Sequence, residues 1–126
     1  MDGPMGFAHE RLIVYQRTCG FLGEVAQLLR GLPRGEAALA DQHRRAGDSI
    51  LLNIAEGAGR MASREKAHHY EIARGSAAEC AAALDLLAIR GRATAPVLDR
   101  VRSVLREIVC MLTALARSAR ERAATG

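Results

Sequence analysis

Five polar residues between positions 45 and 60 have the types and the spacing of a binding surface. On a helix of about 100° per residue they lie within about 80° of one another. They are Arg45, Ser49, Asn53, Glu56 and Arg60. This polar ridge of guanidinium, carboxylate, amide and hydroxyl groups can bind water, a neighbouring helix, another subunit or a ligand. Arg60 follows Glu56 by one turn, so we expect these two to pair.

Partners for the polar ridge are expected on the segment that contains Gly75, Ser76 and Glu79. We expect Glu79 to pair with Arg45, and the side chains of Ser49 and Asn53 to bind groups of that segment. Removing the partner of a buried charge costs on the order of 3 to 5 kcal/mol. The ridge is therefore predicted to be structural first, and Glu56→Ala is predicted to lower stability or to disrupt assembly.

Catalytic and metal-binding patterns are weak in this chain. Glu65 and His68 match the Glu-x-x-His pattern of di-metal bundles, but such a site needs a second pair and two further carboxylates. The sequence has no second Glu-x-x-His, so this pair is interpreted as a solvated helical turn. His43 precedes two arginines and is expected at the surface. No nucleophile motif or phosphate loop occurs. We expect no catalytic residue, no metal and no cofactor, hence no enzyme.

The net charge of +4 comes almost wholly from arginine, with Lys66 as the single lysine. A basic balance suits nucleic acid or acidic lipid, but solvated arginine-rich helix faces explain it equally well. The candidate phosphate-binding residues form two groups. One lies near a predicted turn and the other near the C-terminus: Arg64 and Lys66, then Arg117, Arg120 and Arg122. Aromatic residues are scarce, so any contact is predicted to be to phosphates and independent of base sequence.

Three cysteines, Cys19, Cys80 and Cys110, have apolar neighbours and no Cys-x-x-Cys spacing. We expect buried free thiols in a reducing compartment. The first residues lack the basic and apolar regions of a signal peptide. No run of about 18 apolar residues is present, so no membrane span is predicted. These observations favour a cytoplasmic protein.

Apolar residues recur at spacings of three and four along four segments, which predicts helices. The segments are about 9–30, 36–59, 64–89 and 95–117. Joined by short loops, they predict an all-α fold, an antiparallel up-down-up-down four-helix bundle over residues 9–117. Flexible tails are expected at 1–8 and 118–126. In the first segment, the expected core row contains Tyr15, Cys19 and Leu22, with Phe21 and Val25 in a second row. The second segment has one apolar stripe, and the third has one row: Ala46, Ile50, Ile54 and Gly57, then Tyr70, Ala73, Ala77, Cys80, Leu84 and Leu87. The fourth segment also has two rows, and this excess predicts burial against a second subunit.

The polar ridge also carries a family resemblance. Together with its neighbours it resembles a four-helix-bundle family whose founding members are encoded in intervening sequences of bacterial large-subunit ribosomal RNA genes. The matching residues are Gln42-His43-Arg44-Arg45-Ala46, Ser49-Ile50, Asn53-Ile54-Ala55-Glu56-Gly57 and Gly59-Arg60. Three further pieces are similar: Leu12-Ile13-Val14-Tyr15-Gln16; Pro33 with Glu36 and Leu39; and Ile72-Ala73-Arg74-Gly75-Ser76 with Glu79. Many relatives carry proline two residues after Ser49, where this chain has Leu51.

The resemblance implies architecture more than activity. Similar proteins form homopentameric rings of four-helix protomers. One branch, the accessory variability determinant of diversity-generating retroelements, partners a reverse transcriptase and binds nucleic acid through basic surface. The first hypothesis is therefore a non-enzymatic oligomeric scaffold that binds RNA, DNA or a nucleic-acid enzyme such as a reverse transcriptase. The alternative is a self-assembling protein-interaction module with no nucleic-acid role.

Overall fold

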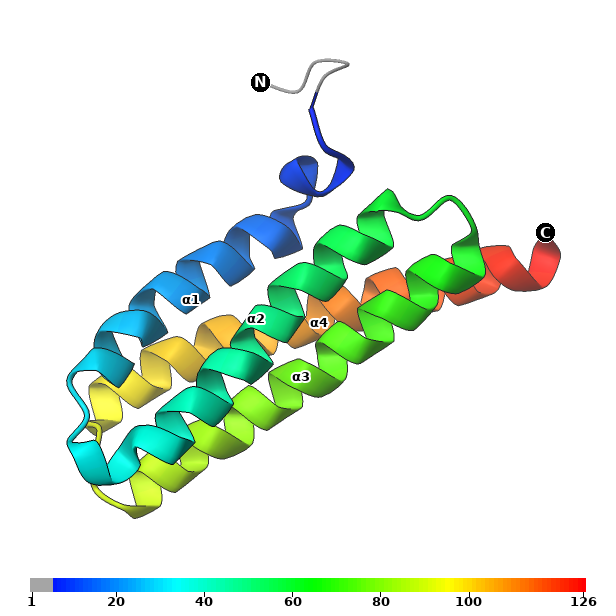
Figure 1. Cartoon of the computed structure of the whole chain (residues 1–126). Helices are drawn as coiled ribbons and strands as arrows, with labels where there is room; N and C mark the ends of the chain where they lie inside the picture. Colours follow the sequence, from blue (N-terminus) through cyan, green and yellow to red (C-terminus); the bar gives the residue numbers. More distant parts are fainter. Residues whose placement is uncertain (1–5) are drawn as a thin grey trace.

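The computed structural model describes residues 6–126, which form four α-helices with short connections (Figure 1). The elements are η1 (Ala8–Arg11), α1 (Ile13–Arg30), η2 (Arg34–Glu36), α2 (Ala37–Gly59), α3 (Ser63–Ile89) and α4 (Ala95–Thr125). No strand occurs among these residues. The predicted all-α class is confirmed. Of the predicted N-terminal tail, residues 1–5 lie outside the described residues, and Ala8 already belongs to η1.

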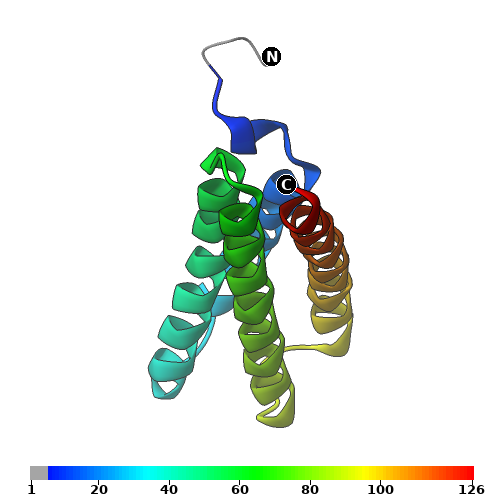
Figure 2. The same cartoon turned by 90° about the vertical axis from the view of Figure 1, so that its right-hand side faces the viewer.

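The four α-helices occupy the corners of a four-sided arrangement. Contacts join α1 to α2, α2 to α3, α3 to α4, and α4 back to α1, while no Cα atoms of α1 and α3, or of α2 and α4, lie within 8 Å of each other. Viewed from another side, α1 lies behind the other three helices (Figure 2). The closest packing is that of α3 with α2 and α4. Small side chains permit this approach, since Ala67, Ala73 and Ala77 of α3 are fully buried.

The core rows of α2 and α3 match the sequence prediction. On α2 the predicted apolar stripe is buried: Ala46, Ile50, Ile54 and Gly57. On α3 the whole predicted row is buried: Tyr70, Ala73, Ala77, Cys80, Leu84 and Leu87. These rows bury full aliphatic and aromatic side chains, each of which contributes about 1.5 to 3 kcal/mol. They make α2 and α3 the centre of the core.

The predicted core row of α1 is wrong by about one residue. The buried residues include Val14, Thr18, Phe21 and Val25, whereas Cys19 is exposed. The two candidate rows are neighbours on the helix, so either one could have faced the core. The deciding position is Thr18, whose hydroxyl donates to the carbonyl of Val14 at 2.7 Å. This local hydrogen bond lets a polar residue lie in the buried row.

The predicted flexible tail at residues 118–126 is also corrected, because α4 continues to Thr125. The sequence there is rich in alanine and arginine, which are strong helix formers. Ala119 is fully buried. Arg120 binds Glu71 of α3, which anchors the last turns of α4. A polar segment therefore extends the helix instead of fraying.

Two further surface and burial predictions are corrected. His43, expected at the surface, is 1% exposed because it lies one turn from Leu39 and Ala46 on the buried stripe of α2. Of the three cysteines, all predicted to be buried, only Cys80 is. Burial, with a smaller effect of Glu79, raises the pKa of the Cys80 thiol to about 12. Among residues 6–126 no helix has both the length and the apolarity to cross a membrane.

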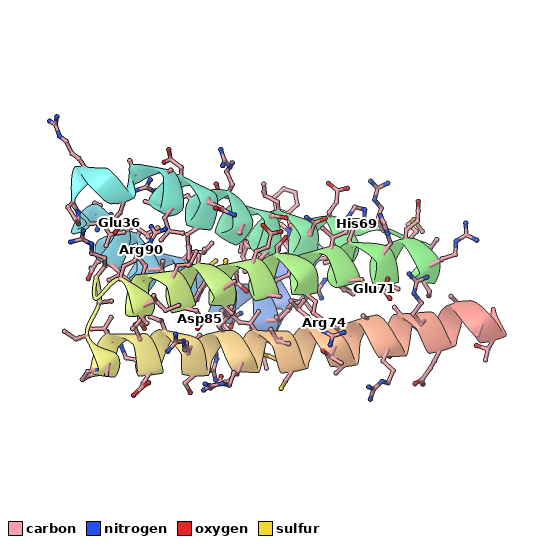
Figure 3. The ribbon with its side chains drawn as sticks, turned by 90° about the horizontal axis from the view of Figure 1, so that it is seen from below. Glu36, His69, Glu71, Arg74, Asp85 and Arg90 are labelled. Carbon is pink, nitrogen blue, oxygen red and sulfur yellow. The ribbon has the colours of Figure 1, made fainter. Side chains whose placement is uncertain are left out.

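A buried carboxylate fastens the end of the bundle where α2 begins. Glu36 accepts a hydrogen bond from Arg90 at 2.6 Å and another from Arg92 at 2.8 Å. Both arginines lie in the connection between α3 and α4, and Glu36 and Arg90 are labelled in Figure 3. Gly91 between them has φ of +66°, a backbone conformation suited to glycine. The hydrogen bonds from Arg92 and then Arg90 lower the pKa of Glu36.

We expect Glu36→Gln to lower the thermal midpoint of unfolding at neutral pH, because the amide loses both ion pairs. A carboxyl group whose pKa is lower in the folded chain than in the unfolded chain stabilises the fold at pH values above its ordinary pKa near 4.5. That stabilisation is lost as the pH falls through the lower folded pKa. The difference in thermal midpoint between the wild type and Glu36→Gln should therefore become smaller in acid. Thermal unfolding followed by circular dichroism measures this difference. Glu121→Gln, at an exposed side chain, is the control. A difference that stays constant with pH would contradict this role.

Candidate nucleic-acid interface

The middle of the polar ridge forms a hydrogen-bonded seam between α2 and α3. The hydroxyl of Ser76 donates to that of Ser49 at 2.7 Å. Asn53 donates to the Ser49 carbonyl at 2.9 Å, and its Oδ1 lies 3.0 Å from Nδ1 of His69. The prediction that Ser49 and Asn53 bind groups of the third helical segment is confirmed. These side chains hold two helices together, so they are largely used within the protomer.

The charged members of the polar ridge lie at the surface. Arg60 donates to Glu56 at 2.8 Å, as predicted, and both side chains are about half exposed. Such a surface pair contributes about 0.3 to 0.5 kcal/mol. Removing such a weak pair should change the stability of the protomer little, so the predicted effect of Glu56→Ala on stability has no physical basis. Its effect on assembly stays a prediction. The predicted pair of Arg45 with Glu79 is wrong, because no ion pair joins these exposed side chains within residues 6–126.

The two glycines around the seam have different surroundings. Gly75, a predicted interface residue, is exposed, and a Cβ added there would meet no atom within 4 Å. Gly57, one residue after Glu56 of the polar ridge, is buried against α3. A Cβ at this position would lie 2.8 Å from a ring carbon of Tyr70 and 3.2 Å from Cβ of His69. Gly57 is a helical residue of α2, within the segment 36–59 that the sequence predicted to be helical. Its glycine is required by helix packing.

Basic residues from distant parts of the sequence meet at one end of the bundle. The α2–α3 connection and the last turns of α4 both lie at this end (Figure 1). A hollow of about 380 Å³ is lined by Arg60, Arg64, Glu65, His68, His69 and Arg120. A second hollow of about 500 Å³ lies between Arg64 and Arg122. We call Arg60, Arg64, Arg120 and Arg122 the basic end. The structure thus joins the two groups of phosphate-binding candidates predicted from the sequence.

The basic side chains of this region differ in how free they are to bind a ligand. Arg120 makes two bonds to Glu71, at 2.9 and 2.6 Å, which lowers the pKa of Glu71. Lys66 donates to the carbonyls of Gly57 at 3.2 Å and Ala58 at 2.9 Å. It therefore satisfies the C-terminal carbonyls of α2 and is less available to a ligand than predicted. Arg64 and Arg117 have no ion pair within residues 6–126.

The Glu-x-x-His pair, Glu65 and His68, lies beside the basic end. His68 packs edge-on against His69, with ring centroids 5.5 Å apart. In the part of the chain that the structure describes, no group of three side chains able to hold a metal ion is found. Guanidinium groups dominate the hollow, and they bind oxyanions rather than metal ions. The arrangement is therefore chemically suited to phosphate oxygens.

Comparisons with known proteins agree with this architecture. No functionally curated protein matches the chain. A crystal structure from Bacteroides thetaiotaomicron, a protein of unknown function from the S23 ribosomal protein family, superposes with a TM-score of 0.78 at 23% identity. The match covers 82% of this chain and 98% of that one, and shows a shared fold. The family model of the 23S rRNA-intervening sequence protein matches residues 10–114. Since this match spans most of the sequence, the chain belongs to the family of 23S rRNA-intervening sequence proteins.

Proposed function

We propose that this protein is a non-enzymatic oligomeric scaffold whose basic end binds the phosphates of RNA or DNA. The observation that carries the proposal is the convergence of Arg60 from the α2–α3 connection, Arg64 from α3, and Arg120 and Arg122 from α4. Arginine side chains bind phosphate through charged, planar pairs of N–H donors. The protomer is proposed to be an antiparallel up-down-up-down bundle, which the short connections and the contacts between consecutive helices support.

The proposed assembly is a homo-oligomeric ring, with a pentamer suggested by the family resemblance. On α1 and α4 the apolar residues beside the buried rows, among them Tyr15, Leu22, Val104 and Met111, pack partly against the protomer's own core. They therefore support oligomerisation less than the sequence suggested. Support comes instead from large apolar side chains left at the surface, among them Phe7, Leu52 and Ile89. Native mass spectrometry is expected to give a pentamer. A stable monomer at micromolar concentration in sedimentation would contradict the ring.

Phosphate contact independent of base sequence is the expected binding mode. Phe21 and Tyr70 are buried, and Phe7 is the one largely exposed phenylalanine or tyrosine among residues 6–126, so bases find few platforms on which to stack. Most of the affinity must then come from arginine through the release of counterions. A ring repeats each basic end around its axis, so several weak sites act on one nucleic acid and avidity increases. The modest net charge of one chain is therefore sufficient.

The test compares matched pairs of arginines at the two ends of the bundle. Arg64→Ala with Arg122→Ala removes two charges of the basic end that form no ion pair within residues 6–126. Arg30→Ala with Arg34→Ala removes the same charge from the other end of the bundle, because Arg30 ends α1 and Arg34 begins η2 (Figure 1). In filter binding, the first variant should bind more weakly. Its salt slope should fall by about 0.7 to 0.9 for each phosphate that the protein no longer neutralises.

The control pair should bind like the wild type. Equal losses in the two variants would show that only the net charge matters. Absence of binding to single- and double-stranded RNA and DNA at low salt would reject the nucleic-acid role. That result would favour the alternative, a self-assembling protein-interaction module, which the exposed apolar side chains support. A partner such as a reverse transcriptase fits either role, and a reverse-transcriptase gene beside this one would support it. We place the protein in the cytoplasm, where its free thiols stay reduced.

A further inference from the structure

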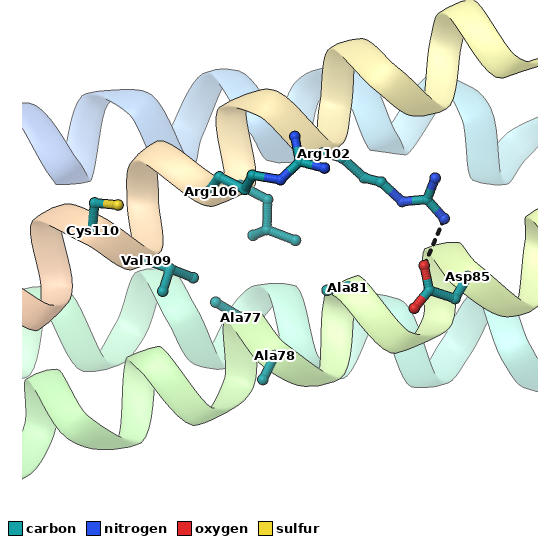
Figure 4. A pocket seen from close by; sticks show the side chains of 9 residues that line it. Ala77, Ala78, Ala81, Asp85, Arg102, Arg106, Val109 and Cys110 are labelled. Carbon is teal, nitrogen blue, oxygen red and sulfur yellow. Dashed lines mark hydrogen bonds and ion pairs between the residues drawn. The ribbon is translucent and has the colours of Figure 1, made fainter.

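The outer face of α3 and α4 contains an apolar groove. It is a hollow of about 420 Å³ (Figure 4). The small side chains of Ala77, Ala78 and Ala81 form the α3 side, and Leu105 and Val109 lie on the α4 side. Because the alanines fill little space, the groove has room for a large aliphatic side chain. Leaving this apolar surface in water is unfavourable.

The groove carries one uncompensated positive charge. At one end, Arg102 is paired with Asp85 at 2.6 Å (Figure 4). Arg106 also lines the groove but has no ion-pair partner within residues 6–126. An occupant that fits must therefore present an apolar side chain and, beside it, a carboxylate.

The α2 helix presents that combination on its outer surface. Leu52 is 66% exposed. It lies about 200° around the helix from the buried Ile50, so it points away from the core. Asp48 precedes it by one turn, is exposed and has no ion pair within the described residues. Leu52 also borders a second hollow, beside the exposed Phe7. We call Asp48 and Leu52 the α2 knob.

The groove and the α2 knob lie on different sides of the protomer. The groove is on the face of α3 and α4, and the contacts between helices place the α1–α2 pair across the bundle from that face. Because the two complementary patches lie on different sides of the protomer, two copies cannot make both groove–knob contacts at once around a two-fold axis. They form head-to-tail contacts, which close into a ring when the rotation between copies permits it.

We propose that the groove of one copy receives the α2 knob of the next. Leu52 fills the groove floored by alanines, and the carboxylate of Asp48 pairs with Arg106 of the neighbouring copy. This proposal rests on the homo-oligomer proposed above and specifies its contact. Burial of Leu52 in the groove supplies the stability of the contact between copies. The ion pair sets the position of one copy against the next, because any placement that brings like charges together is strongly unfavourable.

Charge reversal at the two ends of the predicted ion pair tests the contact. Asp48→Arg and Arg106→Asp should each weaken assembly by about tenfold or more, because each places like charges together. The double variant should recover the wild-type assembly, since the pair is restored in reverse. Assembly is measured by sedimentation across a concentration series. Glu121→Arg, an exposed reversal at the end of α4, is the control and should leave assembly unchanged.

A disulfide trap gives a second readout that uses the native thiol in the groove. Cys110 lines the groove and is exposed. In a Cys19→Ser background, Leu52→Cys should form intermolecular disulfides with Cys110 on mild oxidation. A non-reducing gel should then show a ladder that Cys110→Ser abolishes. Ala88→Cys, exposed on α3 away from the α2 knob, is the matched control and should give no ladder.

The outcomes separate this contact from the oligomer itself. A wild-type chain that sediments as a monomer overturns both the proposed ring and this contact. An oligomer that neither reversal weakens and that forms no disulfide between positions 52 and 110 overturns the contact alone. Weakening by both single reversals without recovery in the double variant also overturns it, because the two residues then act separately.

Discussion

Gly57→Ala is expected to destabilise the protein by about 1 to 3 kcal/mol, the usual cost of overpacking a core. On helix propensity alone the substitution should be favourable, because glycine within a helix costs up to about 1 kcal/mol relative to alanine. Packing reverses the sign of this change in stability. The added methyl group would lie 2.8 Å from the Tyr70 ring, which is buried and cannot move away freely. The contact with Cβ of His69 at 3.2 Å limits movement in the other direction.

Gly20→Ala is the matched control for Gly57→Ala. Gly20 also lies within a helix, but a Cβ there would meet no atom within 4 Å. This variant is expected to gain about 0.5 to 1 kcal/mol of stability from propensity alone. Urea unfolding followed by circular dichroism measures both changes. If Gly57→Ala were as stabilising as Gly20→Ala, the close approach of α2 and α3 would not be what requires glycine at position 57.

His43→Leu is expected to stabilise the protein by about 1 to 3 kcal/mol, the cost of a buried polar group without a partner. The Nε2 atom of His43 is buried and makes no hydrogen bond within residues 6–126. The ring lies beside Phe21, with centroids 6.0 Å apart, in the apolar interior. Leucine has a similar volume and no polar atom to satisfy. The substitution removes the penalty while keeping the packing.

The pH dependence of His43→Leu provides a sharper test. Burial lowers the pKa of His43 from its ordinary value of 6.5, and the nearby Arg44 lowers it further. As the pH falls below 6.5, the unfolded chain binds a proton that the native state excludes, so the wild type loses stability. Leucine cannot bind that proton, so the advantage of the variant should grow in acid.

Thermal unfolding at a series of pH values measures this advantage. His68→Leu, at an exposed histidine, is the control and should change stability by about 0.5 kcal/mol or less. An advantage of His43→Leu that does not grow with acidity would show that the native state accepts the proton.

The sequence predicted the fold class and the faces of α2 and α3, because their apolar residues form a single row each. It could not orient α1, where two neighbouring apolar rows compete and the buried row contains Thr18. It misplaced His43 because the two arginines that follow it suggested a surface, although its spacing from Leu39 placed it in the core. Periodicity was the better guide to burial at this position.

The candidate site was predictable in residue type but not in geometry. Arg64 and Arg120 lie far apart in the sequence, and only the return of α4 along α3 brings them to one hollow. The Glu36 cluster could not be predicted for the same reason, since Arg90 and Arg92 come from a distant connection. A signal was present, because Glu36 lies within a segment that resembles the family pattern. Contacts between distant charges depend on helix packing, which spacing along one helix does not reveal.

The position of Lys66 has a consequence for regulation. The only lysine of the chain is held by the carbonyls at the end of α2. The surface that would meet a phosphate backbone therefore consists of guanidinium groups, which keep their charge across the cellular pH range. Acetylation, which silences lysine-based contacts by removing a charge, has no target among those arginines. On Lys66 the same modification would instead disturb the junction of two helices and alter the scaffold itself.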